Sequence, residues 1–291
     1  MSEPRTFDAE LIDRIERLLG APLVQHRAVQ GGYTPALRLI CETRLGRCFV
    51  KIGSTPLVNS FVHRELSVYQ RLRGPFMPSL LAYDDNPESP ILITEEFSMG
   101  TWPPPWDTHQ VVMALEQIEV MHATPAPQLE PFATVHPQRE LGWQSVADDP
   151  APFLALGLAD GNWLDAALPE LLDYERRCRT DGTSLCHWDL RSDNMCFIDN
   201  RAVIVDWNLA CLSNPKLDLA FWLPSLAYEG GPSPEQLLPD APEEAAWVSG
   251  FFAARAGLPP VPNGPRVRLV QRQQLETALP WVARALDLPL P

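Results

Sequence analysis

Three consecutive prolines at positions 103–105 separate two parts of the sequence that differ in their periodicity. Proline fixes φ and has no backbone N–H, so neither a helix nor a central strand can continue through this stretch. Helical spacing before it predicts helices over 7–20 and 59–73. Alternation of apolar and polar residues predicts five strands, over 22–30, 36–43, 47–52, 79–83 and 91–97.

Beyond the prolines the pattern is mainly helical. Apolar residues recur at helical spacing over 110–122 and 162–179, short strands and loops follow over 185–212, and most of the remainder is helical again. We therefore expect an α+β protein with two lobes, a small antiparallel β-rich lobe of residues 1–98 and a larger, mainly α lobe of residues 99–291.

The charge is unevenly distributed. The chain has 23 Lys and Arg against 37 Asp and Glu, a net charge of −14, which argues against nucleic acid as a partner. Residues 1–98 are nearly balanced, whereas residues 99–291 carry 12 basic and 25 acidic side chains. Such a lobe can attract a cationic small molecule, although solubility is the simpler explanation.

The cysteines and the hydropathy exclude other classes. The six cysteines form no CxxC pair, so their spacing predicts no zinc site. The sequence has no apolar run of 18 residues, and its charged, amphipathic N-terminal segment is unlike a signal peptide. We expect a cytoplasmic protein with reduced thiols and no membrane partner.

Polar residues that suit phosphoryl transfer lie within LCHWDLRSDNMCFIDNRAVIVDWNLA, residues 185–210. A hairpin predicted over 195–205 would return the chain so that Asp206 lies beside Asn194. Carboxylate and amide oxygens are ligands that suit Mg²⁺. Asp189 remains to accept a proton, and these are the parts that phosphoryl transfer from ATP requires.

The same stretch resembles a known family. HWDLRSDN has the HxDxxxxN spacing of protein kinases and of the aminoglycoside phosphotransferase-like small-molecule kinases. The segment IVDW and the later LDLA at 217–220 resemble the small-molecule kinases, and the likeness extends over about residues 20–230. Trp188 departs from the glycine that is most common after the histidine. The resemblance implies a protein-kinase-like fold of two lobes.

In the first lobe the resemblance implies a nucleotide site. Lys51, on the third predicted strand, would bind the nucleotide phosphates, and Glu65 on the next helix would hold this lysine. The turn at Gly31 and Gly32 could close over the phosphates. Backbone groups in a further segment, from Glu95 to Phe97, would bond to adenine. GxxxxGK[ST] is absent from the sequence, which excludes a Walker-type nucleotide site.

In the second lobe the resemblance implies the catalytic residues. Asp189 would position the acceptor hydroxyl and take its proton, while Asn194 and Asp206 would hold Mg²⁺. Arg191 would either face the transferred phosphoryl group or form an ion pair with a loop carboxylate. Asp218 is expected to cap its helix or brace the catalytic loop.

The resemblance implies an ATP- and Mg²⁺-dependent enzyme whose partner is a small molecule with a hydroxyl group. An aminoglycoside or another amine-bearing compound fits the acidic lobe, while sugar, macrolide, choline-like and homoserine-like acceptors stay open. A nucleotide-binding module without activity is a further alternative, but none of the required residues is missing from the sequence. A protein kinase is disfavoured because no APE-like sequence follows Asp206.

Overall fold

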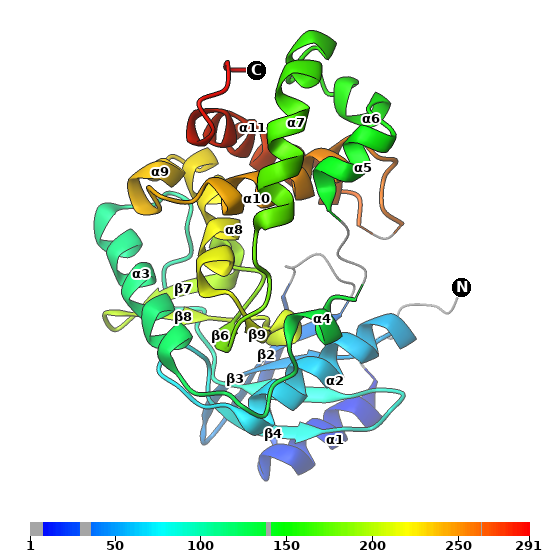
Figure 1. The fold of residues 1–291 in the computed structure, drawn as a ribbon. Helices are drawn as coiled ribbons and strands as arrows, with labels where there is room; N and C mark the ends of the chain where they lie inside the picture. Colours follow the sequence, from blue (N-terminus) through cyan, green and yellow to red (C-terminus); the bar gives the residue numbers. More distant parts are fainter. Residues whose placement is uncertain (1–7, 30–35, 138–140, 263) are drawn as a thin grey trace. The chain divides into compact units, whose positions relative to one another are not determined.

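A computed structural model of the chain describes residues 8–29, 36–137, 141–262 and 264–291 (Figure 1). It divides into two compact units, the first made of Met1–Trp102 with Asp193–Ala210 and the second of Pro103–Ser192 with Cys211–Pro291. In the part of the chain described here, none of the helices has the length and apolar character needed to cross a membrane.

The first unit holds a five-stranded antiparallel sheet, which confirms the predicted β-rich part, and its strand order is β1-β2-β3-β5-β4. Its elements are α1 (Ala9–Leu19), β1 (Leu23–Ala28), β2 (Leu37–Thr43), β3 (Gly46–Ile52), α2 (Pro56–Arg71), β4 (Leu80–Asp84), β5 (Ile91–Thr94), β7 (Met195–Ile198), β8 (Arg201–Ile204) and the 3₁₀ turn η2 (Trp207–Leu209).

Side-chain alternation decides which face of this sheet carries the core. Leu11 and Ile15 of α1 pack with every second residue of β2, β3 and β5 in one buried cluster. The residues of β3 in that cluster are Cys48, Val50 and Ile52. Because successive side chains of a strand point to opposite faces, Lys51 lies on the other face of the sheet.

The last strand of this sheet is shorter than the sequence predicts. β5 ends at Thr94 rather than at residue 97. The Glu95 N–H still bonds to the Ser79 carbonyl at 3.0 Å, but Gly100 then bonds back to the Phe97 carbonyl at 2.9 Å, so the chain turns away from the sheet.

The second unit is mainly helical, as predicted. Its elements are α3 (Thr108–Ala123), α4 (Phe132–Val135), α5 (Gly142–Asp148), α6 (Ala151–Leu154), α7 (Gly161–Arg177), β6 (Ser184–Cys186), β9 (Cys211–Ser213), α8 (Pro215–Tyr228), α9 (Pro234–Leu237), α10 (Pro242–Ala256) and α11 (Val267–Ala285). Helix α10 is central because α5, α7, α8 and α11 all pack against it (Figure 1). Buried along α10 are Trp247, Val248 and Phe252.

Two short elements of this unit position the loop that follows residue 186. Strands β6 and β9 pair antiparallel, with Cys186 directly opposite Cys211. Helix α8 starts two residues after β9, capped by the Asn214 side chain, which accepts the Lys216 N–H at 3.0 Å.

Candidate active site

Lys51 makes two short ion pairs in the first unit. Its Nζ lies 2.6 Å from Glu65 Oε2 and 2.8 Å from Asp206 Oδ1. Lys51 and Glu65 are almost fully buried, at 5% and 3% exposure. Burial alone would lower the pKa of Lys51, but the carboxylates of Asp206 and Glu65 outweigh it and raise that pKa. The lysine is therefore a fixed positive charge.

Lys51, Glu65 and Asp206 each belong to a different element of the first unit. The register of the β2–β3 hairpin places Lys51 on the face opposite α1. Glu65 lies on α2, whose N-terminus is defined by the Thr55 cap and by Pro56 in its first turn. Asp206 stands at the start of η2 with a φ of 67°, a left-handed conformation that aspartate tolerates better than most residues.

The predicted hairpin after Asn194 is confirmed. β7 and β8 pair in register from Met195↔Ile204 to Ile198↔Arg201. Asp199 and Asn200 both have positive φ, 49° and 58°, as a two-residue type I′ turn requires.

The end of this hairpin brings the two candidate metal ligands close together. The Val205 N–H donates to the Asn194 carbonyl at 2.9 Å, so Asp206 directly follows a residue bonded to Asn194. Asn194 is buried, and the Asp206 side chain keeps 25% of its surface exposed. An amide oxygen and a carboxylate are hard donors, so these two residues fit Mg²⁺.

Arg38 is a second cation near this group. It lies directly opposite Lys51 in the β2–β3 pairing, so both side chains are on the same face of the sheet. Burial lowers the pKa of Arg38, and the negative charges of Asp206 and Glu65 act against that effect. No motif in the sequence marks Arg38, although the two-residue turn at 44–45 sets the register that places it opposite Lys51.

The loop after β6, in the second unit, carries Asp189. Its backbone N–H bonds to His187 Nδ1 at 3.3 Å, and its side chain is 31% exposed. Arg191 Nε lies 3.4 Å from Asp189 Oδ1, so the arginine pairs with the candidate base itself. Trp188 has a φ of 64°, a conformation that costs about 1–3 kcal/mol in a residue other than glycine.

Asp218 holds this strained loop. Its Oδ1 accepts the Trp188 N–H at 2.7 Å, and its Oδ2 accepts the His187 N–H at 3.0 Å. Oδ2 also bonds to His122 Nε2 at 2.9 Å. Because Asp218 is fully buried, removal of its carboxylate would leave two backbone N–H groups without this acceptor, at a cost of about 1–3 kcal/mol each.

A second carboxylate, Glu229, is not among the predicted site residues and holds the other end of the loop. Glu229 Oε1 accepts the Ser192 hydroxyl at 2.7 Å, and Oε2 accepts Trp106 Nε1 at 2.7 Å. The Trp106 ring also lies 5.5 Å from that of Trp222. Nothing local in the sequence distinguishes Glu229 from other acidic residues near helix ends.

Comparison with known families identifies the chain. The profile of the phosphotransferase enzyme family matches residues 25–261, which is most of the sequence. The chain belongs to this family. No curated protein sequence matches it.

Solved structures share the fold of this phosphotransferase. A thermostable mutant of an aminoglycoside phosphotransferase, in a ternary complex with ADP and hygromycin B, aligns with a TM-score of 0.59 and 12% identity, over 95% of this chain and 99% of that chain. Choline kinase LicA from Streptococcus pneumoniae aligns with a TM-score of 0.53 and 14% identity, over 91% of this chain and 97% of that chain. At these identities the likeness shows the fold alone.

Glu95 and Phe97, whose backbone groups are predicted to bond to adenine, contact other residues of this phosphotransferase. Glu95 Oε1 forms an ion pair with Arg201 at 2.9 Å, and Oε2 accepts the Ser79 hydroxyl at 3.2 Å. The Phe97 carbonyl already accepts the Gly100 N–H, and its ring is buried. Gly31 and Gly32 lie outside the described residues. The adenine and phosphate-loop contacts therefore stay predictions.

Proposed function

We propose that this phosphotransferase transfers the γ-phosphate of ATP to a hydroxyl group of a small molecule and requires Mg²⁺. The observation that carries the proposal is the buried lysine held by two carboxylates, Lys51 with Glu65 and Asp206. A lysine buried this deeply needs negative partners, and a nucleotide phosphate is an additional one that it can bind.

Each candidate residue has a separate role in this proposal. Lys51 binds the nucleotide phosphates, and Glu65 keeps its ammonium group in place. Asp189 accepts the proton of the acceptor hydroxyl at its carboxylate. Asn194 and Asp206 would hold Mg²⁺, which neutralises charge on the phosphates when bound.

We further propose that the acceptor carries amine groups, as aminoglycosides do. The support is the charge of residues 99–291, with 12 basic and 25 acidic side chains. A field of this sign raises the local concentration of cations. A neutral sugar would gain nothing from it, so the charge of the acceptor separates a sugar from an amine-bearing compound.

A screen for acceptors tests the activity. The protein is incubated with Mg²⁺-ATP and single members of five classes: aminoglycosides, choline, homoserine, sugars and macrolides. ADP release is measured, and mass spectrometry tests for an acceptor that has gained one phosphoryl group. Acceptor-dependent ADP release with a phosphorylated product is expected. ATP binding without transfer to any class would favour the non-catalytic module.

Two variants separate catalysis from nucleotide binding. Asp189→Ala should abolish transfer while the affinity for Mg²⁺-ATP changes by less than about tenfold. Asp206→Ala should remove Mg²⁺-dependent nucleotide binding. Asp173→Ala is the matched control, because Asp173 is exposed on α7 and forms an ion pair with Arg177 one turn along the same helix. Equal loss of ATP binding in a folded Asp189→Ala protein would contradict the role of Asp189.

A further inference from the structure

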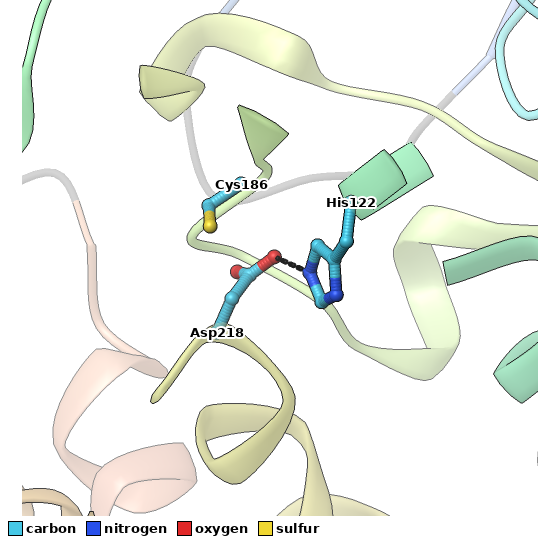
Figure 2. Close-up of side chains that lie close together, drawn as sticks. All are labelled: His122, Cys186 and Asp218. Carbon is cyan, nitrogen blue, oxygen red and sulfur yellow. Dashed lines mark hydrogen bonds and ion pairs between the residues drawn. The ribbon is translucent and has the colours of Figure 1, made fainter. Parts of the chain in front are cut away.

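Three side chains that can bind a metal ion converge in the second unit (Figure 2). They are His122 at the end of α3, Cys186 at the end of β6 and Asp218 in the first turn of α8. One donor atom from each lies within 4.8 Å of the other two, and His122 Nε2 is 2.9 Å from Asp218 Oδ2.

A second sulfur lies next to this group. Cys211 is directly opposite Cys186 in the β6–β9 pair, and directly opposed residues of an antiparallel pair project from the same face. Both cysteines are fully buried. The β6–β9 pair therefore offers a further thiol beside the three converging donors.

We propose that His122, Cys186 and Asp218 form a binding site for Zn²⁺, with Cys211 or water as the fourth ligand. Imidazole, thiolate and carboxylate are the three ligand types that Zn²⁺ takes in proteins, in four-coordinate sites. The donor set disfavours Mg²⁺, which prefers oxygen ligands alone.

The proton and charge balance is consistent with a divalent cation. Zn²⁺ would lie between His122 Nε2 and Asp218 Oδ2, with the imidazole neutral and its proton on Nδ1, and the Cys186 thiol would release its proton to solvent on binding. A 2+ ion offsets the charges of a thiolate and a carboxylate together.

The proposed zinc site is separate from the candidate Mg²⁺ ligands. It shares no residue with Asn194 and Asp206, and all of its ligands belong to the second unit. The cysteine spacing in the sequence predicts no zinc site. Spacing cannot reveal this one, because its ligands come from three distant segments. Asp218 would bind the cation while its carboxylate also accepts the N–H groups of His187 and Trp188.

Cobalt spectroscopy and zinc dialysis test this proposal. The metal-free protein is titrated with Co²⁺ in excess Mg²⁺, and the near-ultraviolet thiolate-to-cobalt charge-transfer band is recorded. Equilibrium dialysis against Zn²⁺ gives the stoichiometry. The band and about one bound Zn²⁺ per chain are expected.

Variants identify the ligands. Cys186→Ser should abolish the band where water is the fourth ligand, or leave only a weaker band from Cys211, and should weaken Zn²⁺ binding by about tenfold or more. His122→Gln should weaken Zn²⁺ binding similarly. This variant replaces Cys186→Ser as the test if circular dichroism shows that Cys186→Ser does not fold. Two controls should leave the cobalt band and the bound Zn²⁺ unchanged. Cys178→Ser is in the same unit but outside the cluster, and Asp206→Asn changes a candidate Mg²⁺ ligand. Absence of a band from the wild-type protein, or a band of full intensity in folded variants of both ligands, would overturn the proposal.

Discussion

The Ser192 hydroxyl donates a hydrogen bond of 2.7 Å to the carboxylate of Glu229, the residue that caps the C-terminus of helix α8. Near the other end of the same helix, Asp218 accepts the backbone N–H groups of His187 and Trp188. The loop that carries Asp189 is therefore held at both ends by one helix.

Replacement of Glu229 tests whether this attachment serves the reaction. Glu229→Ala removes the acceptor for Ser192 and Trp106, and displacement of the loop should lower kcat by about tenfold while KM for ATP changes little. Steady-state kinetics with the acceptor found in the screen provide the measurement.

Glu229→Gln is the conservative control. Its amide oxygen can accept the Trp106 N–H, and its NH₂ group can donate to the Ser192 oxygen, so most of kcat should be retained. If Glu229→Ala has the wild-type kcat and only a lower Tm, Glu229 contributes to stability and does not position the loop.

Arg191 lies 3.4 Å from Asp189, and its removal should affect the chemical step. A guanidinium beside the candidate base can donate to the oxygens of the transferred phosphoryl group, where charge spreads in the transition state. We expect Arg191→Ala to lower kcat by about ten- to a thousand-fold with little change in KM for ATP. An unchanged kcat with a lowered Tm would show that Arg191 only stabilises the loop.

Glu175 on α7 predicts a pH dependence of stability away from the site. Its Oε1 accepts the N–H groups of Gly142 at 2.7 Å and Trp143 at 3.0 Å. Burial outweighs these bonds and raises the pKa of this carboxyl to about 7. The folded state therefore keeps a proton that the unfolded chain releases near pH 4.5.

The sign follows from proton linkage. Below about pH 4.5 both states hold the proton, and above about pH 7 neither does. Between these values the free energy of unfolding should fall as pH rises, by about 3 kcal/mol in total from this group. Urea unfolding from pH 4.5 to 8 measures the slope, which Glu175→Gln should flatten. Glu170→Gln, at an exposed position on the same helix, should keep the wild-type slope.

Ionic strength tests the proposed charge of the acceptor. If the acidic side chains of residues 99–291 attract a cation, kcat/KM should fall as salt is added, because the screening length shortens to about 8 Å at physiological ionic strength. The measurement is kcat/KM across a series of NaCl concentrations at saturating Mg²⁺-ATP. A value independent of salt, together with a neutral acceptor, would favour sugar chemistry.

The sequence by itself determined the elements and the contacts between near neighbours. Alternation predicted five strands, and the Asp199-Asn200 turn predicted the hairpin that brings Asp206 back to Asn194. Such features depend on φ/ψ preferences and on side-chain periodicity over a few residues, which the sequence contains directly. The sequence predicts the end of β5 three residues too late, because Glu95, Glu96 and Phe97 include no glycine or proline to mark the point where the backbone leaves the sheet.

Only the tertiary structure decided the strand order β1-β2-β3-β5-β4 and the partners of the catalytic loop. Ser192 and Glu229 are 37 residues apart, and His122 and Asp218 are 96 apart. Contacts over such separations result from how helices pack around a common core, and no local preference encodes them. For the same reason the cluster of His122, Cys186 and Asp218 is visible only once α3, β6 and α8 are assembled.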